Sequence, residues 1–263
     1  MEIDGSINPL ISAFVHKGIE KAKTDKADCL IIHLNTPGGL LKSTRVIVSD
    51  ILSSSIPVVV YVSPEGAHAG SAGVFITLAA HVAAMAPGTN IGAAHPVNLN
   101  GQSDTVMNEK ATNDAAAFIR SIAEKRNRNL KWAEEAVRNS ISITGKEAVE
   151  KNVVDLIAFS GQDLLEKLDG RTITLNSGNK ILHTRNARII KLEMTASEKV
   201  LNLISDPSVA YILMLIGIYG IMFELYSPGA IFPGVVGVIS LILAFYSLHT
   251  LPVNYAGLAL IVF

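Results

Sequence analysis

Residues 57–85 read PVVVYVSPEGAHAGSAGVFITLAAHVAAM, and this stretch decides the fold. Pro57–Val62 is a β-branched run bounded by turn residues, which predicts a strand buried on both faces. From Ala72 to about Ala80 the residues are apolar or small, which predicts a buried helix, and Val82–Met85 predicts the next strand. Strand, helix and strand in this order form a βαβ unit, so we expect a parallel sheet.

The same alternation of strands and helices continues on both sides of this stretch. Upstream, a strand is predicted over Cys29–Leu34 and helices start at Pro9 and Leu40. Downstream, the turn-rich stretch 87–100 precedes further helices, predicted over 113–126, over 130–139 and from the capping box of Thr144 with Glu147. The fold class is therefore α/β with repeated βαβ units.

The C-terminal part of the chain differs in composition. From Pro207 to Phe263 the only charged residue is Glu224. Two uncharged runs, 209–223 and 230–248, are predicted membrane helices, and Ser227-Pro228-Gly229 between them predicts an antiparallel hairpin. The second run is long enough to span a bilayer, whereas the first is short unless Glu224 lies at an interface. A third apolar run begins at Tyr255.

These patterns predict an α/β domain over residues 1–195, a linker over 196–206 and a membrane region over 207–263. The alternative for the last part is a buried helical hairpin of a soluble domain, although two adjoining runs almost without charge are rare in soluble cores. The N-terminal sequence MEIDGSINPL lacks the basic start and apolar core of a cleavable signal.

Charge and cysteine content exclude several classes of function. The net charge of −1 provides no broad positive field, so nucleic acid is not expected as the main partner. A single cysteine, Cys29, cannot build a disulfide framework or a multi-cysteine zinc site. There is also no HExxH motif or cluster of Cys and His. We therefore expect neither a metal nor a cofactor.

Two glycine-rich turns follow predicted strands, at the edge where open α/β sheets place ligands. They are NTPGG at 35–39 and GAHAGSAG at 66–73. Ser71 stands at a helix start among small residues, with the Ala72 amide pointing outward, and Gly38 or Gly39 could supply a second amide. Together these groups would form an oxyanion hole beside a serine. Close helix packing and a plain turn are the alternative for each motif alone.

Together with the run MAPGTNIGAAHP at 85–96, the segment RNRN at 126–129 and the loop ELYSPG at 224–229, these turns resemble the ClpP-class serine proteases, most closely the NfeD family. The resemblance covers essentially the whole chain. It implies a ClpP/crotonase-like domain tethered to several membrane helices, and a serine endopeptidase acting with or on stomatin-like membrane proteins and in contact with membrane lipid. We also expect a multi-pass protein, a homodimer or higher homo-oligomer, and a protease domain on the extracytoplasmic side.

The family uses a serine–lysine dyad. By this resemblance Ser71 is the nucleophile and Lys110, in the matching segment NEKATN, is the general base; a lysine can serve as base if burial lowers its pKa so that the amine is partly neutral. His68 and His95 are alternative bases, but we expect them to line the substrate site. At Asn139-Ser140, where some members carry an acidic residue, this chain has no carboxylate, so a third member stays open.

Two other functions remain alternatives at this point. A crotonase-type acyl-CoA hydratase or isomerase would use the same oxyanion hole without Ser71 or Lys110. A non-catalytic membrane scaffold of lipid microdomains would need neither Ser71 nor Lys110. For the protease, small residues around Ser71 favour apolar peptide segments as substrate, and the sequence does not specify the cleavage site.

Overall fold

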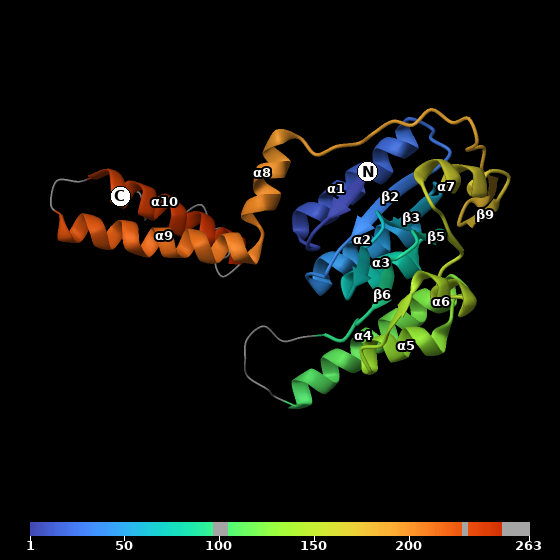
Figure 1. Ribbon diagram of the computed structural model, residues 1–263, viewed down its shortest axis with the longest axis horizontal. Helices are drawn as coiled ribbons and strands as arrows, with labels where there is room; N and C mark the ends of the chain where they lie inside the picture. The colour runs from blue at the N-terminus through green and yellow to red at the C-terminus, as the bar shows by residue number, and fades with distance from the viewer. Residues whose placement is uncertain (97–104, 228–230, 249–263) are drawn as a thin grey trace. The chain divides into compact units, whose positions relative to one another are not determined.

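The computed structural model describes residues 1–96, 105–227 and 231–248 (Figure 1). The chain divides into two compact units, Met1–Glu193 and Met194–Phe263. The first contains the α/β fold that the sequence predicts, and the second contains the apolar C-terminal helices.

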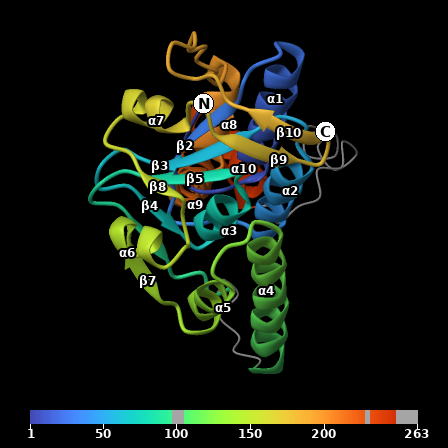
Figure 2. The same ribbon diagram turned by 90° about the vertical axis from the view of Figure 1, so that its right-hand side faces the viewer.

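A five-stranded parallel sheet forms the centre of the first unit (Figure 2). Its strands are β1 (Glu2–Asp4), β2 (Leu30–Asn35), β3 (Val58–Val62), β5 (Val82–Met85) and β8 (Leu156–Ile157), in the order β1-β2-β3-β5-β8. The connections between the first four contain α1 (Pro9–Thr24), α2 (Leu41–Ser53) and α3 (Ala72–Ala79). The predicted βαβ units are confirmed, and β5 has the predicted bounds.

A second, smaller sheet lies beside the first. It consists of β4 (His68–Gly70), β6 (Asn90–Gly92) and β7 (Ser142–Thr144), with β4 parallel to β6 and β6 antiparallel to β7. None of these three-residue strands was predicted, because each is too short to show an alternating pattern. Their pairing joins segments far apart in the sequence.

The remaining helices of this unit are α4 (Thr105–Lys125), α5 (Leu130–Arg138), α6 (Gly145–Glu150) and α7 (Gly161–Leu168), followed by the hairpin β9 (Thr172–Leu175) and β10 (Gly178–Ile181). The capping box at Thr144 and Glu147 is confirmed. However, α4 begins at Thr105 rather than near Asn113. Its first half is polar and mostly exposed, so it carries no apolar periodicity that would predict a helix.

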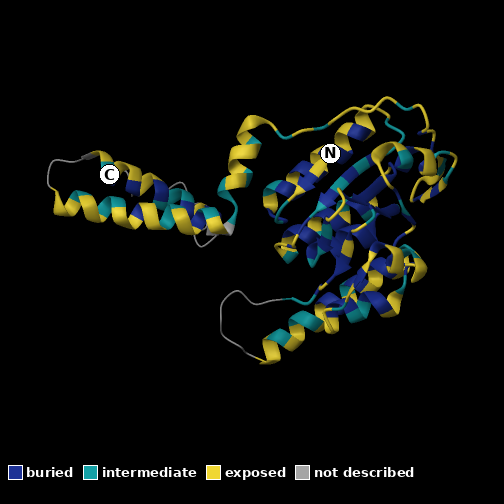
Figure 3. Cartoon of the chain, viewed as in Figure 1, coloured by how far each residue is buried: buried dark blue, intermediate teal, exposed yellow. Residues whose placement is uncertain are grey.

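The core contains β3 and α3, all of whose residues are buried (Figure 3). Val59 and Tyr61 of β3 belong to one cluster with Leu164 and Leu168 of α7. Because side chains alternate along a strand, the other residues of β3 face the opposite side of the sheet. A helix buried along its whole length carries Ser71 at its N-terminal end, which gives that residue a rigid support.

The second unit contains α8 (Ala196–Ile204), α9 (Pro207–Tyr226) and α10 (Ile231–Leu248). The segment predicted as a linker thus forms a helix over most of its length. Ser208–Tyr226 of α9 is long and apolar enough to span a membrane, whereas the apolar part of α10, Phe232–Ser247, is shorter. The prediction had these lengths reversed, because α9 continues past Glu224. Pro228, Gly229 and the run from Tyr255 lie outside the described residues.

The predicted antiparallel hairpin of α9 and α10 is confirmed by its glycine contacts. A Cβ atom added at Gly217 would lie 2.5 Å from Leu241 Cγ, and one at Gly220 would lie 2.6 Å from the Pro233 carbonyl oxygen. Glycine therefore brings the two helices into close contact. At Gly234 an added Cβ would overlap the Glu224 carboxylate, which lies over the first turn of α10.

Candidate active site

Ser71 lies in a strained turn between β4 and α3. Its φ of 48° and ψ of −106° place a non-glycine residue in a left-handed conformation, which costs free energy of order 1–3 kcal/mol. The Ser71 amide donates to the Gly92 carbonyl at 3.0 Å, and the Val74 amide donates to the Ser71 carbonyl at 3.1 Å. Although Ser71 is the N-cap residue of α3, its side chain makes no capping hydrogen bond. Its Oγ is therefore not held by the helix.

The glycine turn after β2 packs directly on Ser71. A Cβ atom at Gly38 would lie 2.7 Å from Ser71 Cβ and 3.1 Å from its Oγ. Backbone pairing holds the two turns together, since the Thr36 amide donates to the His68 carbonyl and the Gly70 amide donates to the Thr36 carbonyl, both at 2.9 Å. The structure thus brings together the two glycine-rich turns that the sequence singled out.

Three amides were predicted as oxyanion donors, and their surroundings differ. Ala72 is the first residue of α3, where an amide has no acceptor within the helix. The Gly38 amide donates to Thr36 Oγ1 at 3.1 Å, so it is already engaged. Gly39 pairs with Ile7, and its two neighbours in the chain make the hydrogen bonds to Ile7. The Gly39 amide therefore points away from Ile7.

The two predicted histidines are half-buried and come from neighbouring segments. The backbone amide of His68, in β4, donates to Asn35 Oδ1 at 3.1 Å. His95 follows β6, and its Nδ1 lies 2.9 Å from the Val137 carbonyl. A carbonyl only accepts, so Nδ1 carries a proton and Nε2 of the neutral ring is the acceptor. Among the described contacts, neither imidazole is hydrogen-bonded to Ser71.

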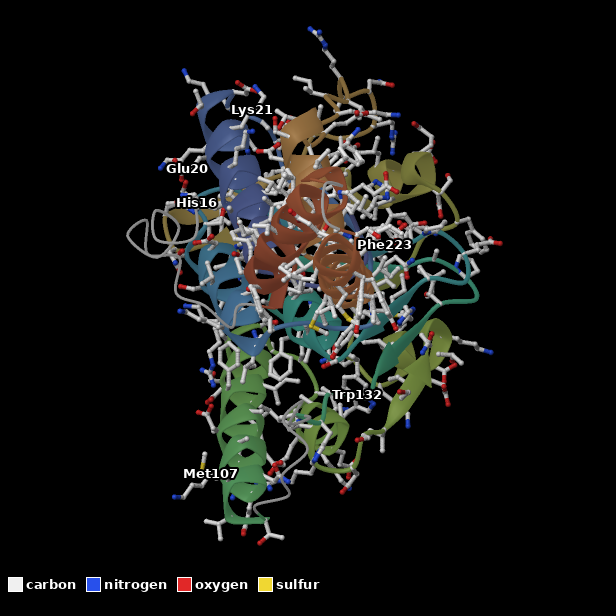
Figure 4. The ribbon with its side chains drawn as sticks, turned by 90° about the vertical axis from the view of Figure 1, so that its left-hand side faces the viewer. His16, Glu20, Lys21, Met107, Trp132 and Phe223 are labelled. Carbon is white, nitrogen blue, oxygen red and sulfur yellow. The ribbon has the colours of Figure 1, made fainter. Side chains whose placement is uncertain are left out.

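Lys110 lies in the first half of α4. That half is exposed or half-buried, and the buried side chains of α4 begin at Ala115. Figure 4 shows Met107 on the same outer part of the helix, away from the core. Lys110 itself is exposed and makes no described hydrogen bond to Ser71. The burial that we expected for a lysine base is thus absent from this chain taken alone.

Two arginines hold the far end of α3, and the sequence analysis gave them no role. Arg126 Nε donates to the Ala79 carbonyl at 2.7 Å, and Arg128 Nε donates to the Leu78 carbonyl at 3.1 Å. Cations suit the C-terminus of a helix, whose carbonyls carry partial negative charge. Burial, followed by the charge of Arg128, lowers the pKa of Arg126 to about 10. The segment 126–129 was singled out only by the family resemblance.

A large cavity lies elsewhere in the first unit. It has a volume of about 1350 Å³, is lined by parts of α1, β2, α7 and the segment 183–193, and includes none of the predicted site residues. Within the described residues there is no group of three His, Cys, Asp or Glu side chains arranged to hold a metal ion.

Two family models match the chain. The model of the NfeD1b N-terminal domain matches residues 1–190, and the model of the NfeD integral membrane domain matches residues 208–263. Among curated relatives, the membrane-bound protease PH1510 of Pyrococcus horikoshii is 36% identical over 265 residues, covering 99% of this chain and 60% of that protein. The membrane protein NfeD1b of Bacillus subtilis is 32% identical over 246 residues, covering 93% and 54%. The chain thus spans less than two thirds of these relatives.

Solved structures of a membrane-bound stomatin-specific protease are similar to this chain. A lysine-to-alanine variant in complex with a substrate peptide is 34% identical, with a TM-score of 0.70 over 77% of this chain and 94% of that one. A serine-to-alanine variant is 35% identical, with a TM-score of 0.68 over 74% and 96%. ClpP1 of Listeria monocytogenes, 21% identical with a TM-score of 0.51 over 62% and 93%, shows the ClpP-like fold alone.

Proposed function

This chain belongs to the NfeD family, and on that premise we propose that it is a membrane-bound serine endopeptidase. The observation that carries the proposal is the strained turn at Ser71. It presents an Oγ that does not cap its helix, directly beside Gly38 and the free amide end of α3. A left-handed serine between a strand and a buried helix is the arrangement by which α/β hydrolases expose a nucleophile.

In the proposed reaction Ser71 Oγ attacks the carbonyl carbon of a peptide bond, and its proton passes to the neutral amine of Lys110. The resulting oxyanion accepts hydrogen bonds from the amides of Ala72 and Gly39. Lys110 then returns the proton to the leaving nitrogen, which leaves an acyl-enzyme on Ser71. Water hydrolyses this ester with Lys110 again as base, and Ser71 is regenerated.

Lys110 as base is supported by the relatives rather than by a contact in this chain. The serine and the lysine substituted in the solved protease variants are separated by almost the same spacing as Ser71 and Lys110. Catalysis then requires the first half of α4 to approach Ser71. Val106 and Met107, 56% and 57% exposed beside Lys110, suit a contact with a second copy or with substrate, and we propose a homodimer or higher homo-oligomer.

The proposed substrate is an apolar segment of a stomatin-like membrane protein. The solved protease relatives are described as stomatin-specific, and α9 places this chain at a membrane. We further propose that the chain crosses the membrane more than once and that its protease unit lies on the extracytoplasmic side. Peptides rich in Leu, Val and Ala should be cleaved faster than Lys- and Arg-rich peptides of equal length.

A fluorophosphonate probe tests the nucleophile directly, because it reacts with activated serines only. We expect the full chain in detergent to be labelled and the Ser71→Ala variant to remain unlabelled. Ser121→Ala is the matched control: Ser121 is an exposed serine of α4 whose Oγ donates to the Phe118 carbonyl. Labelling that survives Ser71→Ala, or native chain that is folded yet unlabelled, would refute the proposal. The second result would favour a non-catalytic scaffold.

A further inference from the structure

Helix α8 has an apolar face that is largely exposed within the second unit. None of its residues is buried, and Val200 and Leu203 are 56% and 63% exposed. These two side chains are three residues apart, so they share one face of the helix, which Ile204 extends. Glu198 and Asn202 lie on the opposite face. An exposed apolar face of this kind needs a cover of matching chemistry.

The connection to α9 places α8 at the membrane. Only Ser205 and Asp206 separate the two helices, so the end of α8 lies within about 11 Å of the start of α9. Asp206 accepts a hydrogen bond from the Ser208 amide and caps α9, which marks a sharp break between the helices. The matched integral membrane domain begins at residue 208. The last turn of α8 is therefore at the level where the membrane begins.

The direction of α8 suits the surface of a bilayer rather than its interior. Figure 1 shows α8 turned sharply away from the axis of α9. If α9 crosses the bilayer, a helix turned across its axis runs along the membrane plane. Its capping box of Thr195 and Glu198 stabilises the N-terminal end without help from another element. An amphipathic helix in this position buries its apolar face at the boundary of headgroups and acyl chains.

We propose that α8 is an interfacial helix whose Val200, Leu203 and Ile204 side chains insert into the lipid surface beside α9. The occupant of the apolar face is thus lipid rather than a second protein. This proposal rests on the membrane position of α9 and not on the catalytic role of Ser71. As a consequence, α8 is held at the lipid surface next to α9, and the polypeptide that leads into the membrane helices does not act as a free tether.

Fluorescence quenching tests this in the full chain reconstituted in phosphatidylcholine and phosphatidylglycerol vesicles. Cys29→Ser removes the native thiol, and an environment-sensitive fluorophore is attached to Leu203→Cys, to Val200→Cys or, as the matched control, to Asn202→Cys. We expect lipid-bound spin labels to quench the probes at 200 and 203 roughly threefold more than the probe at 202. Aqueous iodide should show the reverse order. Fluorescence of Trp132, the sole tryptophan and buried in the first unit, verifies that each labelled protein is folded.

Three results would overturn the proposal. Equal quenching by lipid-bound labels at 202 and 203 would show that the helix has no lipid-facing side. Efficient iodide quenching at all three positions would show that α8 is in water. Protection of the probe at 203 from both quenchers would show that protein, rather than lipid, covers the apolar face.

Discussion

The turn that holds Ser71 and the helix half that holds Lys110 are built in opposite ways. Around Ser71 the backbone is determined by hydrogen bonds from three separate segments, and Gly38 and α3 pack tightly against it. Around Lys110 the side chains are exposed and the helix has few buried contacts until Ala115. A nucleophile that must be exposed by strain needs a rigid frame, whereas the proposed base lies in a segment whose side chains are mostly exposed.

This difference indicates that the chain builds the turn at Ser71 by itself, whereas positioning Lys110 requires a partner. Strain at Ser71 persists because the surrounding backbone over-determines it. The first half of α4 is mostly exposed, although Asn113 accepts a hydrogen bond from Arg138 and Asp114 pairs with Arg45. The proposed dyad is therefore expected to form only when a second copy or a bound substrate covers this half of α4.

The largest expected effect concerns Lys110. Replacing it by alanine removes the proposed proton acceptor, so peptide hydrolysis should fall by roughly 10³-fold or more. Lys125→Ala, at the other end of the same helix, should leave the rate nearly unchanged. The double variant with Ser71→Ala should be scarcely slower than either single variant, because the two groups act as one unit. A Lys110→Ala protein that keeps most of its activity would remove the lysine from the mechanism.

The pH dependence of hydrolysis distinguishes the lysine from the two histidines. Only a neutral amine accepts a proton, so the rate should rise toward alkaline pH rather than level off above a histidine transition near about 6.5. His68→Ala and His95→Ala should retain that rise. If His95→Ala abolishes the activity of a protein that is still folded, His95, whose Nδ1 donates to the Val137 carbonyl, is the base instead of Lys110.

A substitution at Gly39 tests the rigidity of the glycine turn that packs against Ser71. An added methyl group there would overlap the backbone of Ile7, at a φ of 155°, so Gly39→Ala should lower the free energy of unfolding by about 3 kcal/mol or more. Gly161→Ala is the control, because nothing lies within 4 Å of its added Cβ. Denaturant unfolding followed by Trp132 fluorescence measures both. Equal stability of the two variants would show that the glycine turn is not a fixed frame.

A smaller effect is expected at Thr36, which is fully buried. Its Oγ1 accepts from the Gly38 amide and donates to the Gly38 carbonyl, each at 3.1 Å. Thr36→Val keeps the shape but leaves the amide unpaired, which should cost about 1–2 kcal/mol. Thr36→Ser should restore most of that stability. If the serine variant is as unstable as the valine variant, packing rather than the hydrogen bond holds the turn.

An effect of similar size concerns the far end of α3, where His81 accepts a hydrogen bond from the Val58 amide at 3.2 Å. Burial, followed by the charge of Arg126, lowers the pKa of His81 to about 3. Below about pH 6.5 His81 is therefore protonated in the unfolded chain but stays neutral in the folded chain. The contribution of His81 to the free energy of unfolding is complete above that pH. As the pH falls from about 6.5 to 3, the free energy of unfolding should decrease by about 1–2 kcal/mol, after allowance for the partial exposure of His81.

His81→Gln removes this titration and isolates its contribution. The difference in unfolding free energy between native and variant protein should shrink as the pH falls from 7 toward 4, measured by Trp132 fluorescence. An unchanged difference across that range would show that His81 is protonated in the folded chain.

The amino-acid sequence alone determined the elements that are long, apolar and local. The buried strands β2, β3 and β5 and the helix α3 follow from runs of apolar residues, because a segment buried on all sides needs little more than its own composition. The same reasoning located the membrane helices and the hairpin between them. The small residues around Ser71 marked the candidate nucleophile, and only the family resemblance distinguished Lys110 from the other lysines.

Tertiary structure decided what depends on residues far apart in the sequence. The strands β4, β6 and β7 exist through pairing with one another, since three residues alone have no preference strong enough to form a strand. The difference between Gly38 and Gly39 as oxyanion donors arises because Thr36 Oγ1 binds one amide while Ile7 turns the other away. The exposure of Lys110 depends on which neighbours α4 packs against, and that is a property of the folded chain rather than of the motif around the lysine.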